Sequence, residues 1–322
     1  MPFPCPMNIL VVTNMYPHRE NPNYGTFIKQ QVEGLRALGH SVEVFFIEGY
    51  RLRRTYITCI WTIYQKTRAG KFDIVHAHYG LSSITALFRH RTPLVVTYHG
   101  SDVLLGFRDP FISKIGSLFA DDVIIVSAKM AKRIPGHVIP SGIDMTMFRP
   151  YDKREARARL HLPLEKNLVL FPYNPKRPVK RFDLAKQAVD ILVKKGINVE
   201  MVVLSNVQNE MMPWYYSAVD VTVLSSYSEG SPTAIKESIC CNTPVVSTDV
   251  GDIRDIIDKI EGTFICRAEP EDFARGIEAA IKRAALVGFN GRPAMKRYDL
   301  LTTCSAIVDV YRGVLRKHGR AV

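Results

Sequence analysis

The chain has 322 residues, of which 47% are apolar, so it can bury a large core and most naturally forms two domains. Its formal net charge of +12 favours anionic partners. The sequence carries no signature of a nucleic-acid-binding module, and we expect no nucleic acid among the partners. The six cysteines form no C-x-x-C pair and lie partly in apolar runs, which is typical of buried thiols in a reducing cytoplasm.

The beginning of the chain lacks the basic and apolar regions of a secretory signal, and no stretch is long and apolar enough to span a bilayer. We therefore expect a cytoplasmic protein whose contact with a membrane, if it has one, is peripheral.

Short β-rich runs alternate with amphipathic stretches through both halves of the chain. This pattern predicts parallel sheets with helices on both faces, as in two Rossmann-like domains in tandem. The predicted strands of the first half are residues 8–13, 41–47, 72–77, 93–98 and 122–127. Those of the second half are residues 167–171, 198–204, 220–225, 243–248 and 262–266. A Pro- and Gly-containing turn followed by a charged segment separates the halves, which predicts domains 1–147 and 148–299.

The peptide of residues 51–68 combines basic and apolar side chains at helical spacing. It contains Arg51, Arg53, Arg54, Lys66 and Arg68 together with Tyr56, Ile57, Ile60, Trp61, Ile63 and Tyr64. This composition is typical of a helix that lies on an anionic membrane surface. The alternative is an ordinary helix that packs its apolar side on the first sheet, and both interpretations can hold at once.

Two glutamates, Glu229 and Glu237, flank the predicted start of a helix. Ser231 is the predicted N-cap and Pro232 the first helical residue. At a rise of about 1.5 Å per residue, Glu237 lies roughly 7 to 8 Å along the axis from Pro232. A helix start attracts phosphate, and this span suits a diphosphate with a sugar at each end. The alternative is that both glutamates are solvated surface acids.

Several further residues stand where ligands bind in open parallel sheets, beyond the carboxyl ends of the strands. Gly25 follows the first predicted strand and opens a helix, so it suits close approach of the backbone to a phosphate or an acceptor, or simply a tight turn. His76 and His78 end another strand. We assign His78 to the wall of a cleft between the domains and His76 to packing.

The order and spacing of these motifs resemble the retaining glycosyltransferases of family 4, which have the GT-B fold. The resemblance rests on the segments NILVVTNMYP, GLRALGHSVEV, FDIVHAHYG, VVTYHGSD and VIPSGIDMTMFRP and on the block from Glu229 to Glu237. The sequence of the second half is most similar to the branch of the family whose enzymes take part in teichuronic-acid and related cell-surface polysaccharide synthesis. The resemblance implies two Rossmann-like domains that face each other across a cleft, with a helix at residues 300–318 returning to the first domain.

The resemblance also implies roles for individual residues. Glu229 holds the transferred sugar near the reacting carbon, and Glu237 binds the two ribose hydroxyls. Lys180 neutralises the leaving diphosphate, and Arg177 is the nearest candidate for the family's second cation. His99, with Asp102 to orient it, faces the donor sugar. Backbone N–H groups near the helix start add contacts to the sugar and diphosphate, from Gly230, Ser231 and Thr233.

The implied reaction moves a sugar from a nucleotide diphosphate-sugar, with a UDP-sugar as the expected donor, to a hydroxyl of a glycan or lipid-linked acceptor. Retention by double displacement needs a second carboxylate about 5 Å away, which the motif does not supply, so same-face substitution is favoured. We expect no metal and no cofactor. The alternatives are a GT-B epimerase or phosphorylase and a non-catalytic nucleotide-sugar-binding protein. A nicotinamide dehydrogenase is disfavoured because no G-x-G-x-x-G follows the first strand.

Overall fold

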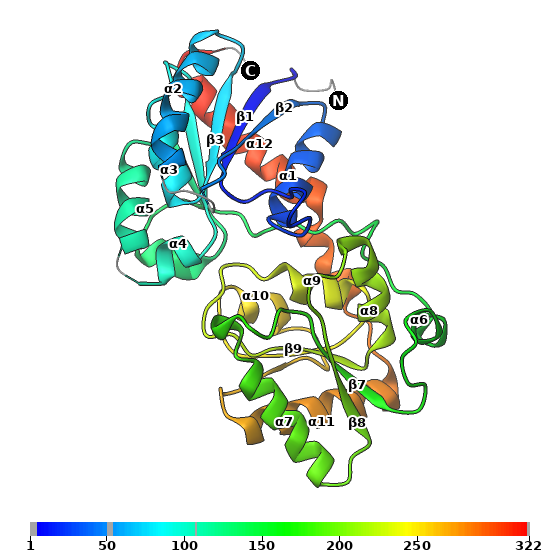
Figure 1. Ribbon diagram of the computed structural model, residues 1–322. Coiled ribbons are helices and arrows are strands. Elements are labelled where there is room, and N and C mark those ends of the chain that lie inside the picture. Colours follow the sequence, from blue (N-terminus) through cyan, green and yellow to red (C-terminus); the bar gives the residue numbers. More distant parts are fainter. Residues whose placement is uncertain (1–4, 50–53, 107, 321–322) are drawn as a thin grey trace. The chain divides into compact units, whose positions relative to one another are not determined.

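The computed structural model describes residues 5–49, 54–106 and 108–320, which divide into two units (Figure 1). The first unit contains the residues up to Gly142 and those from Leu300 onward, and the second runs from Ile143 to Asp299. The predicted boundary between residues 147 and 148 thus falls a few residues inside the second unit. None of the described helices is both long and apolar enough to cross a membrane.

The first unit is built on a parallel sheet with the strand order β2-β1-β3-β4-β5-β6. Its strands are β1 (Asn8–Thr13), β2 (Ser41–Phe46), β3 (Ile74–His78), β4 (Leu94–Tyr98), β5 (Asp122–Ile125) and β6 (His137–Val138). Sequence periodicity predicted all of these except β6, which has only two residues, both exposed. Such a short edge strand carries no alternation that a sequence pattern could reveal.

Helices cover both faces of this sheet. They are α1 (Thr26–Ala37), α2 (Thr55–Arg68), α3 (Gly80–Ala86), α4 (Ser101–Leu104), α5 (Arg108–Leu118), the 3-10 helix η1 (Ala128–Lys132) and α12 (Leu300–Lys317). Alternate residues of β1 face opposite sides, as a strand requires. Ile9 and Val11 pack with α1 and α12, whereas Leu10 and Val12 pack on the side of α2 and α3. The C-terminal helix therefore belongs to the core of the first unit.

The second unit repeats this architecture with the strand order β11-β10-β9-β7-β8, again parallel. Its strands are β7 (Asn167–Phe171), β8 (Val199–Val203), β9 (Val221–Leu224), β10 (Val245–Ser247) and β11 (Phe264–Ile265). Its helices are α6 (Lys153–Arg159), α7 (Phe182–Lys194), α8 (Met212–Ala218), α9 (Thr233–Cys240), α10 (Ile253–Ile257) and α11 (Pro270–Val287), with the 3-10 helices η2 (Pro178–Lys180), η3 (Asn209–Met211) and η4 (Arg292–Tyr298).

Here too, neighbouring residues of one strand enter different cores. Leu168 and Leu170 of β7 pack on the side of α8, α9 and α10. Val169 and Phe171 pack on the side of α7 and α11. All five predicted strands of this half are present, and the two Rossmann-like units confirm the predicted fold class.

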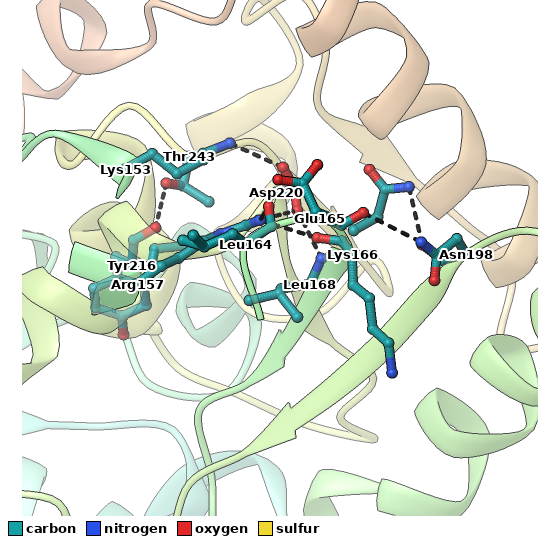
Figure 2. Close-up of polar contacts among 12 residues, drawn as sticks. Lys153, Arg157, Leu164, Glu165, Lys166, Leu168, Asn198, Tyr216, Asp220 and Thr243 are labelled. Atoms are coloured by element: carbon teal, nitrogen blue, oxygen red, sulfur yellow. Dashed lines mark hydrogen bonds and ion pairs between the residues drawn. The ribbon is translucent and has the colours of Figure 1, made fainter. Parts of the chain in front are cut away.

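A charged network holds the amino ends of the strands in the second unit (Figure 2). Arg157 of α6 donates to the carbonyl of Ala218 and to Oδ2 of Asp220, at 2.8 and 2.7 Å. The same Asp220 oxygen accepts the backbone N–H of Leu168 at the start of β7, at 2.6 Å. Lys153 pairs with the other oxygen of Asp220, at 2.9 Å. These contacts stabilise the end of the sheet opposite the strands' carboxyl ends, which are the usual ligand side.

Candidate functional site

Lys180, at the end of η2, and Glu229, in the loop that follows β9, form a short ion pair. Oε1 of Glu229 accepts from Nζ of Lys180 and from Oγ of Ser226, each at 2.6 Å. The ammonium also lies 3.9 Å from the centre of the Tyr173 ring, a cation-π contact. Burial lowers the pKa of Lys180, and the Glu229 carboxylate opposes this shift. The structure thus joins the predicted sugar-binding acid to the predicted phosphate-binding cation.

Glu237 lies inside α9 and is only 7% exposed. Its Oε2 accepts from the hydroxyl of Tyr216 in α8, at 3.0 Å. Burial raises the pKa of Glu237 to about 7, and the hydrogen bonds from Tyr216 and Thr233 oppose that shift. A proton is therefore held on Glu237 at a pH where an exposed glutamate is ionised.

Tyr173 shows that the two glutamates belong to one site. Its hydroxyl is buried and finds no hydrogen-bond partner among the described residues. Burial raises the pKa of Tyr173, and the charges of Glu229 and Glu237 both raise it further. Both carboxylates thus lie near this ring, and the alternative of two solvated surface acids is wrong.

The first turn of α9 has no side-chain cap. Pro232 is the N-cap and Thr233 the first helical residue, so the helix begins one residue later than predicted. Ser231, the predicted N-cap, lies one residue before the N-cap of the structure, and its Oγ donates to Oδ2 of Asp252 at 2.6 Å. As the N-cap, proline has no side-chain group that accepts from the first-turn N–H groups, and a helix start attracts an anion.

Arg177 precedes the short helix that carries Lys180, and its side chain is exposed. Its positive charge lowers the pKa of both Lys180 and Tyr173, so the guanidinium lies close to the ion pair. The second unit therefore gathers two cations and two carboxylates around Tyr173. The described residues contain no group of three or more His, Cys, Asp or Glu side chains that could hold a metal ion.

In the first unit, His78 ends β3 and His99 follows β4. Nδ1 of His78 and Nε2 of His99 are 2.9 Å apart. Burial lowers the pKa of His78 to about 3 and that of His99 well below its usual value, so both rings are neutral at physiological pH. His78 is fully buried, which contradicts its assignment to a cleft wall. The alternation along β3 turns its ring into the protein, where it supports His99.

His76 is a packing residue, as predicted. It is fully buried, with Nε2 at 2.7 Å from Oγ1 of Thr97 and Nδ1 at 2.6 Å from the hydroxyl of Tyr311 in α12.

Asp102 orients the backbone beside His99 rather than the histidine ring. Its Oδ1 accepts from the N–H groups of His99 and Gly100, at 3.0 and 2.9 Å. Burial raises the pKa of Asp102 to about 7, although these two hydrogen bonds oppose the shift. The side of His99 that remains accessible lines a small pocket of the first unit, together with Phe27 and Gln31.

Gly25 is the N-cap of α1 and has a φ of +69°, which disfavours any residue with a side chain. A Cβ atom here would lie 2.5 Å from the carbonyl carbon of Met15. The tight turn by itself explains this glycine, and its predicted contact with a ligand stays a prediction.

Two family models match the two units in turn. Residues 8–147 match the model described as "Glycosyltransferase Family 4". Residues 168–283 match the model described as "Glycosyl transferases group 1". The chain belongs to these glycosyltransferases.

Among curated proteins, this glycosyltransferase is 27% identical to TuaC of Bacillus subtilis, whose name assigns it to teichuronic acid biosynthesis. That alignment covers 84% of this chain and 88% of TuaC. It is 26% identical to a D-inositol 3-phosphate glycosyltransferase of Geodermatophilus obscurus, over 75% of this chain and 66% of the relative.

Solved structures share the fold at low identity. A sucrose-phosphate synthase of Thermosynechococcus elongatus superposes with a TM-score of 0.72 and 18% identity, covering 96% of this chain and 99% of that one. The Anabaena protein HepE, in complex with UDP and glucose, gives a TM-score of 0.72 and 17% identity, with 95% and 99% coverage. The glycosyltransferase therefore has the GT-B fold.

Sequence reasoning missed several residues of this site. Tyr173 follows the carboxyl end of β7, and that position was a usable signal because ligands bind there. The sequence did not indicate a role for Tyr216, Lys236 or Asp252, because the residues that they contact come together only in the folded chain.

Proposed function

We propose that this glycosyltransferase moves a sugar from a nucleotide diphosphate-sugar to a hydroxyl of a glycan or lipid-linked acceptor, with retention at the anomeric carbon. The observation that carries the proposal is the cluster around Tyr173. It combines an acid in a loop, an acid in a helix, a buried lysine and a helix start whose N-cap is proline. A UDP-sugar is the expected donor, and the solved complexes of HepE with UDP and UDP-glucose support this choice.

In the proposal, the donor spans the cluster from Glu237 to Glu229. The oxygens of Glu237 accept hydrogen bonds from the two ribose hydroxyls. The diphosphate lies against the first-turn N–H groups of α9 and the cations Lys180 and Arg177. Glu229 accepts hydrogen bonds from hydroxyls of the transferred sugar. Since Lys180 and Glu229 are already paired, the groups that bind the two halves of the donor are held in a fixed relation before it arrives.

The reaction breaks the bond between the anomeric carbon and the diphosphate oxygen and forms a bond from the acceptor oxygen on the same face of the sugar. The acceptor's proton passes to the departing diphosphate. Lys180, Arg177 and the amides at the start of α9 stabilise the charge that grows on this leaving group. The remaining contribution is the positioning of donor and acceptor. In the first unit, we assign to His99 a hydrogen bond with the donor sugar.

This assignment requires neutral His99, because a neutral imidazole can accept or donate without adding charge. Its low pKa supports that role. The proposal involves no metal ion, since side-chain cations and helix amides supply the positive charge.

We also propose that the first unit contacts an anionic membrane through α2 and α5. On α2, Ile63 and Thr67 are buried, in agreement with packing on the sheet, while Ile57 and Trp61 are exposed, with Trp61 62% accessible. The neighbouring exposed residues include Arg54 and Arg68. Arg51 and Arg53 lie outside the described residues. An amphipathic surface that carries both apolar and basic side chains suits acidic lipid.

The exposed apolar surface continues beyond α2. Helix α3 packs against both α2 and α5, so the three helices lie side by side (Figure 1). Phe111 and Leu118 lie seven positions apart on α5 with Lys114 between them, and Phe119 follows the helix. All four are exposed, with Phe111 at 66%. This placement supports attachment on the inner face of the cell membrane, beside a lipid-linked acceptor.

A thermal-shift panel of UDP, GDP, ADP and dTDP tests the donor proposal, with Glu237→Ala as the matched variant. We expect one nucleotide, UDP, to stabilise the wild-type protein and to lose its effect in the variant. Stabilisation that survives Glu237→Ala would contradict the ribose role. No stabilisation by any of the four would contradict the proposed donor class and favour the alternative of an epimerase with another ligand or a non-catalytic protein.

A further inference from the structure

Three polar side chains form a buried network under the start of α9. Oγ of Ser231 donates to Oδ2 of Asp252, and Nζ of Lys236 donates to the same Ser231 hydroxyl. The ammonium lies 3.5 Å from Oδ2 of Asp252 and 4.7 Å from the centre of the Tyr298 ring. Lys236 is fully buried and Asp252 is 3% exposed. None of these three side chains contributes chemistry to the proposed reaction.

Such a network contributes little net free energy to the stability of a fold. The desolvation of two buried charges offsets much of their attraction, and well-packed apolar side chains of similar volume often serve stability equally well. Burial lowers the pKa of Lys236 and raises that of Asp252, while each charge opposes the shift of the other. The two groups therefore depend on each other for their ionised states, and the network must stay intact to remain charged.

The network is attached to the loop that carries Glu229. Ser231 follows Glu229 and Gly230 directly, and Asp252 follows Gly251, whose backbone touches that loop. A Cβ atom on Gly251 would lie 2.4 Å from the carbonyl oxygen of Gly230 and 3.0 Å from that of Glu229. The loop is thus held by the contact of Gly251 with Glu229 and Gly230 and by the Ser231 hydroxyl.

The same contacts determine what the helix start offers to a ligand. The N-cap of α9 is Pro232, and the residue before it, Ser231, is tied by its hydroxyl to Asp252. The hydrogen bond to Asp252 and the close contact with Gly251 restrain the backbone of residues 229–231 beside this first turn. A loop with this fixed backbone can present its amides to a diphosphate without ordering them at the moment of binding.

We propose that Ser231, Lys236 and Asp252 form a positioning network that fixes the Glu229–Ser231 backbone for the donor diphosphate. The proposal rests on the proposed function, because it concerns the same donor. The three residues act through the loop and make no contact with the reacting atoms. Their loss weakens contacts to the diphosphate while the ribose contact at Glu237 remains.

The decisive variant is the double replacement Lys236→Met with Asp252→Leu, which removes both charges together. Lys236→Met alone leaves the Asp252 carboxylate buried without its cation and should unfold at a clearly lower temperature. The double variant should unfold at a temperature close to that of the wild type, since no unpaired charge remains. The matched control is Lys186→Met, which breaks the exposed pair between Lys186 and Asp190. This control should leave both stability and ligand binding unchanged.

Binding of UDP and UMP separates positioning from stability. At a temperature where every variant is folded, the double variant should bind UDP about tenfold more weakly, while its affinity for UMP changes by less than about threefold. A merely structural role would leave the ratio of the two affinities as in the wild type, and that result would overturn the inference. Wild-type protein that binds neither UDP nor the other diphosphates would overturn the proposed function itself.

Hydrogen exchange gives a readout that needs no ligand. In the double variant, amides of residues 226–235 should exchange faster, while those of α7 keep the wild-type rate. Equal rates for residues 226–235 in the double variant and the wild type would overturn the positioning role, whatever the nucleotide experiments show. Ser231→Ala should reproduce the faster exchange, because it removes the group through which the charges hold the loop.

Discussion

Replacement of Glu237 by glutamine should make the protein more stable at neutral and alkaline pH. In the folded protein, burial raises the pKa of Glu237 to about 7 from a reference value of 4.5. A raised pKa means that the folded state holds the proton more tightly than the unfolded state. The stability that this proton provides is complete below pH 4.5 and is lost as the pH rises to about 7.

The size of this loss follows from the shift in pKa. One pKa unit corresponds to about 1.4 kcal/mol, so the shift corresponds to about 3 kcal/mol of unfolding free energy. Glutamine has nearly the same shape, can accept the hydrogen bond from Tyr216 and does not ionise. Glu237→Gln should therefore match the wild type near pH 5 and exceed it by a few degrees in Tm at pH 8, a direction opposite to that of most buried substitutions.

The assay is thermal or urea unfolding of the two proteins at pH 5, 6, 7 and 8. Asp102, whose pKa is raised in the same range, is present in both proteins, so the difference between them isolates Glu237. Glu200→Gln, at an exposed position paired with Lys166, is the control and should show no such pH dependence. A stability difference between Glu237→Gln and wild type that does not change with pH would refute the reasoning.

Three further substitutions probe the Lys180–Glu229 ion pair, the Tyr173 hydroxyl and the exposed apolar surface of α2 and α5. Lys180→Met should lower the free energy of unfolding by about 3 kcal/mol, because Glu229 loses its cation, and should reduce kcat about a hundredfold or more; near-wild-type kcat would contradict its role at the leaving group. Tyr173→Phe should keep the wild-type Tm, since the hydroxyl has no protein partner among the described residues, but should weaken UDP binding measured by calorimetry; a large loss of Tm with unchanged affinity would oppose this. Trp61→Ala with Phe111→Ala should reduce salt-sensitive sedimentation with vesicles that contain phosphatidylglycerol, and equal sedimentation of variant and wild type would exclude this surface.

The sequence was sufficient to predict both sheets because each predicted strand is a short run of β-branched and aliphatic residues. Val169 and Leu170, for example, are adjacent and enter different cores, as expected of a strand in a sheet that is covered on both faces. Strand β6 was not predictable, since His137 and Val138 are both exposed and form a strand only through their pairing with β5. The end of the second domain at Asp299 follows from the helical spacing of the next segment, whereas its start at Ile143 has no sequence signal.

The candidate site was predictable where its residues follow strands or begin helices. Glu229, Glu237 and Lys180 were identified, and the structure brings the first and last into direct contact. The start of α9 was predicted one residue too early because serine before proline is a good N-cap pattern, and nothing in the sequence shows that the Ser231 hydroxyl meets a buried aspartate. His78 was misplaced for a related reason, since alternation along a strand does not say which face of the sheet is covered.

Calorimetry with UDP and UDP-glucose tests most directly the claim that Glu229 and Glu237 bind the two ends of one donor. Glu237→Ala should lose affinity for both ligands, because both carry the ribose. Glu229→Ala should bind UDP nearly as the wild type does and lose only the additional affinity that the sugar provides. Equal losses for UDP and UDP-glucose in Glu229→Ala, or wild-type affinity of Glu237→Ala for UDP, would contradict the claim.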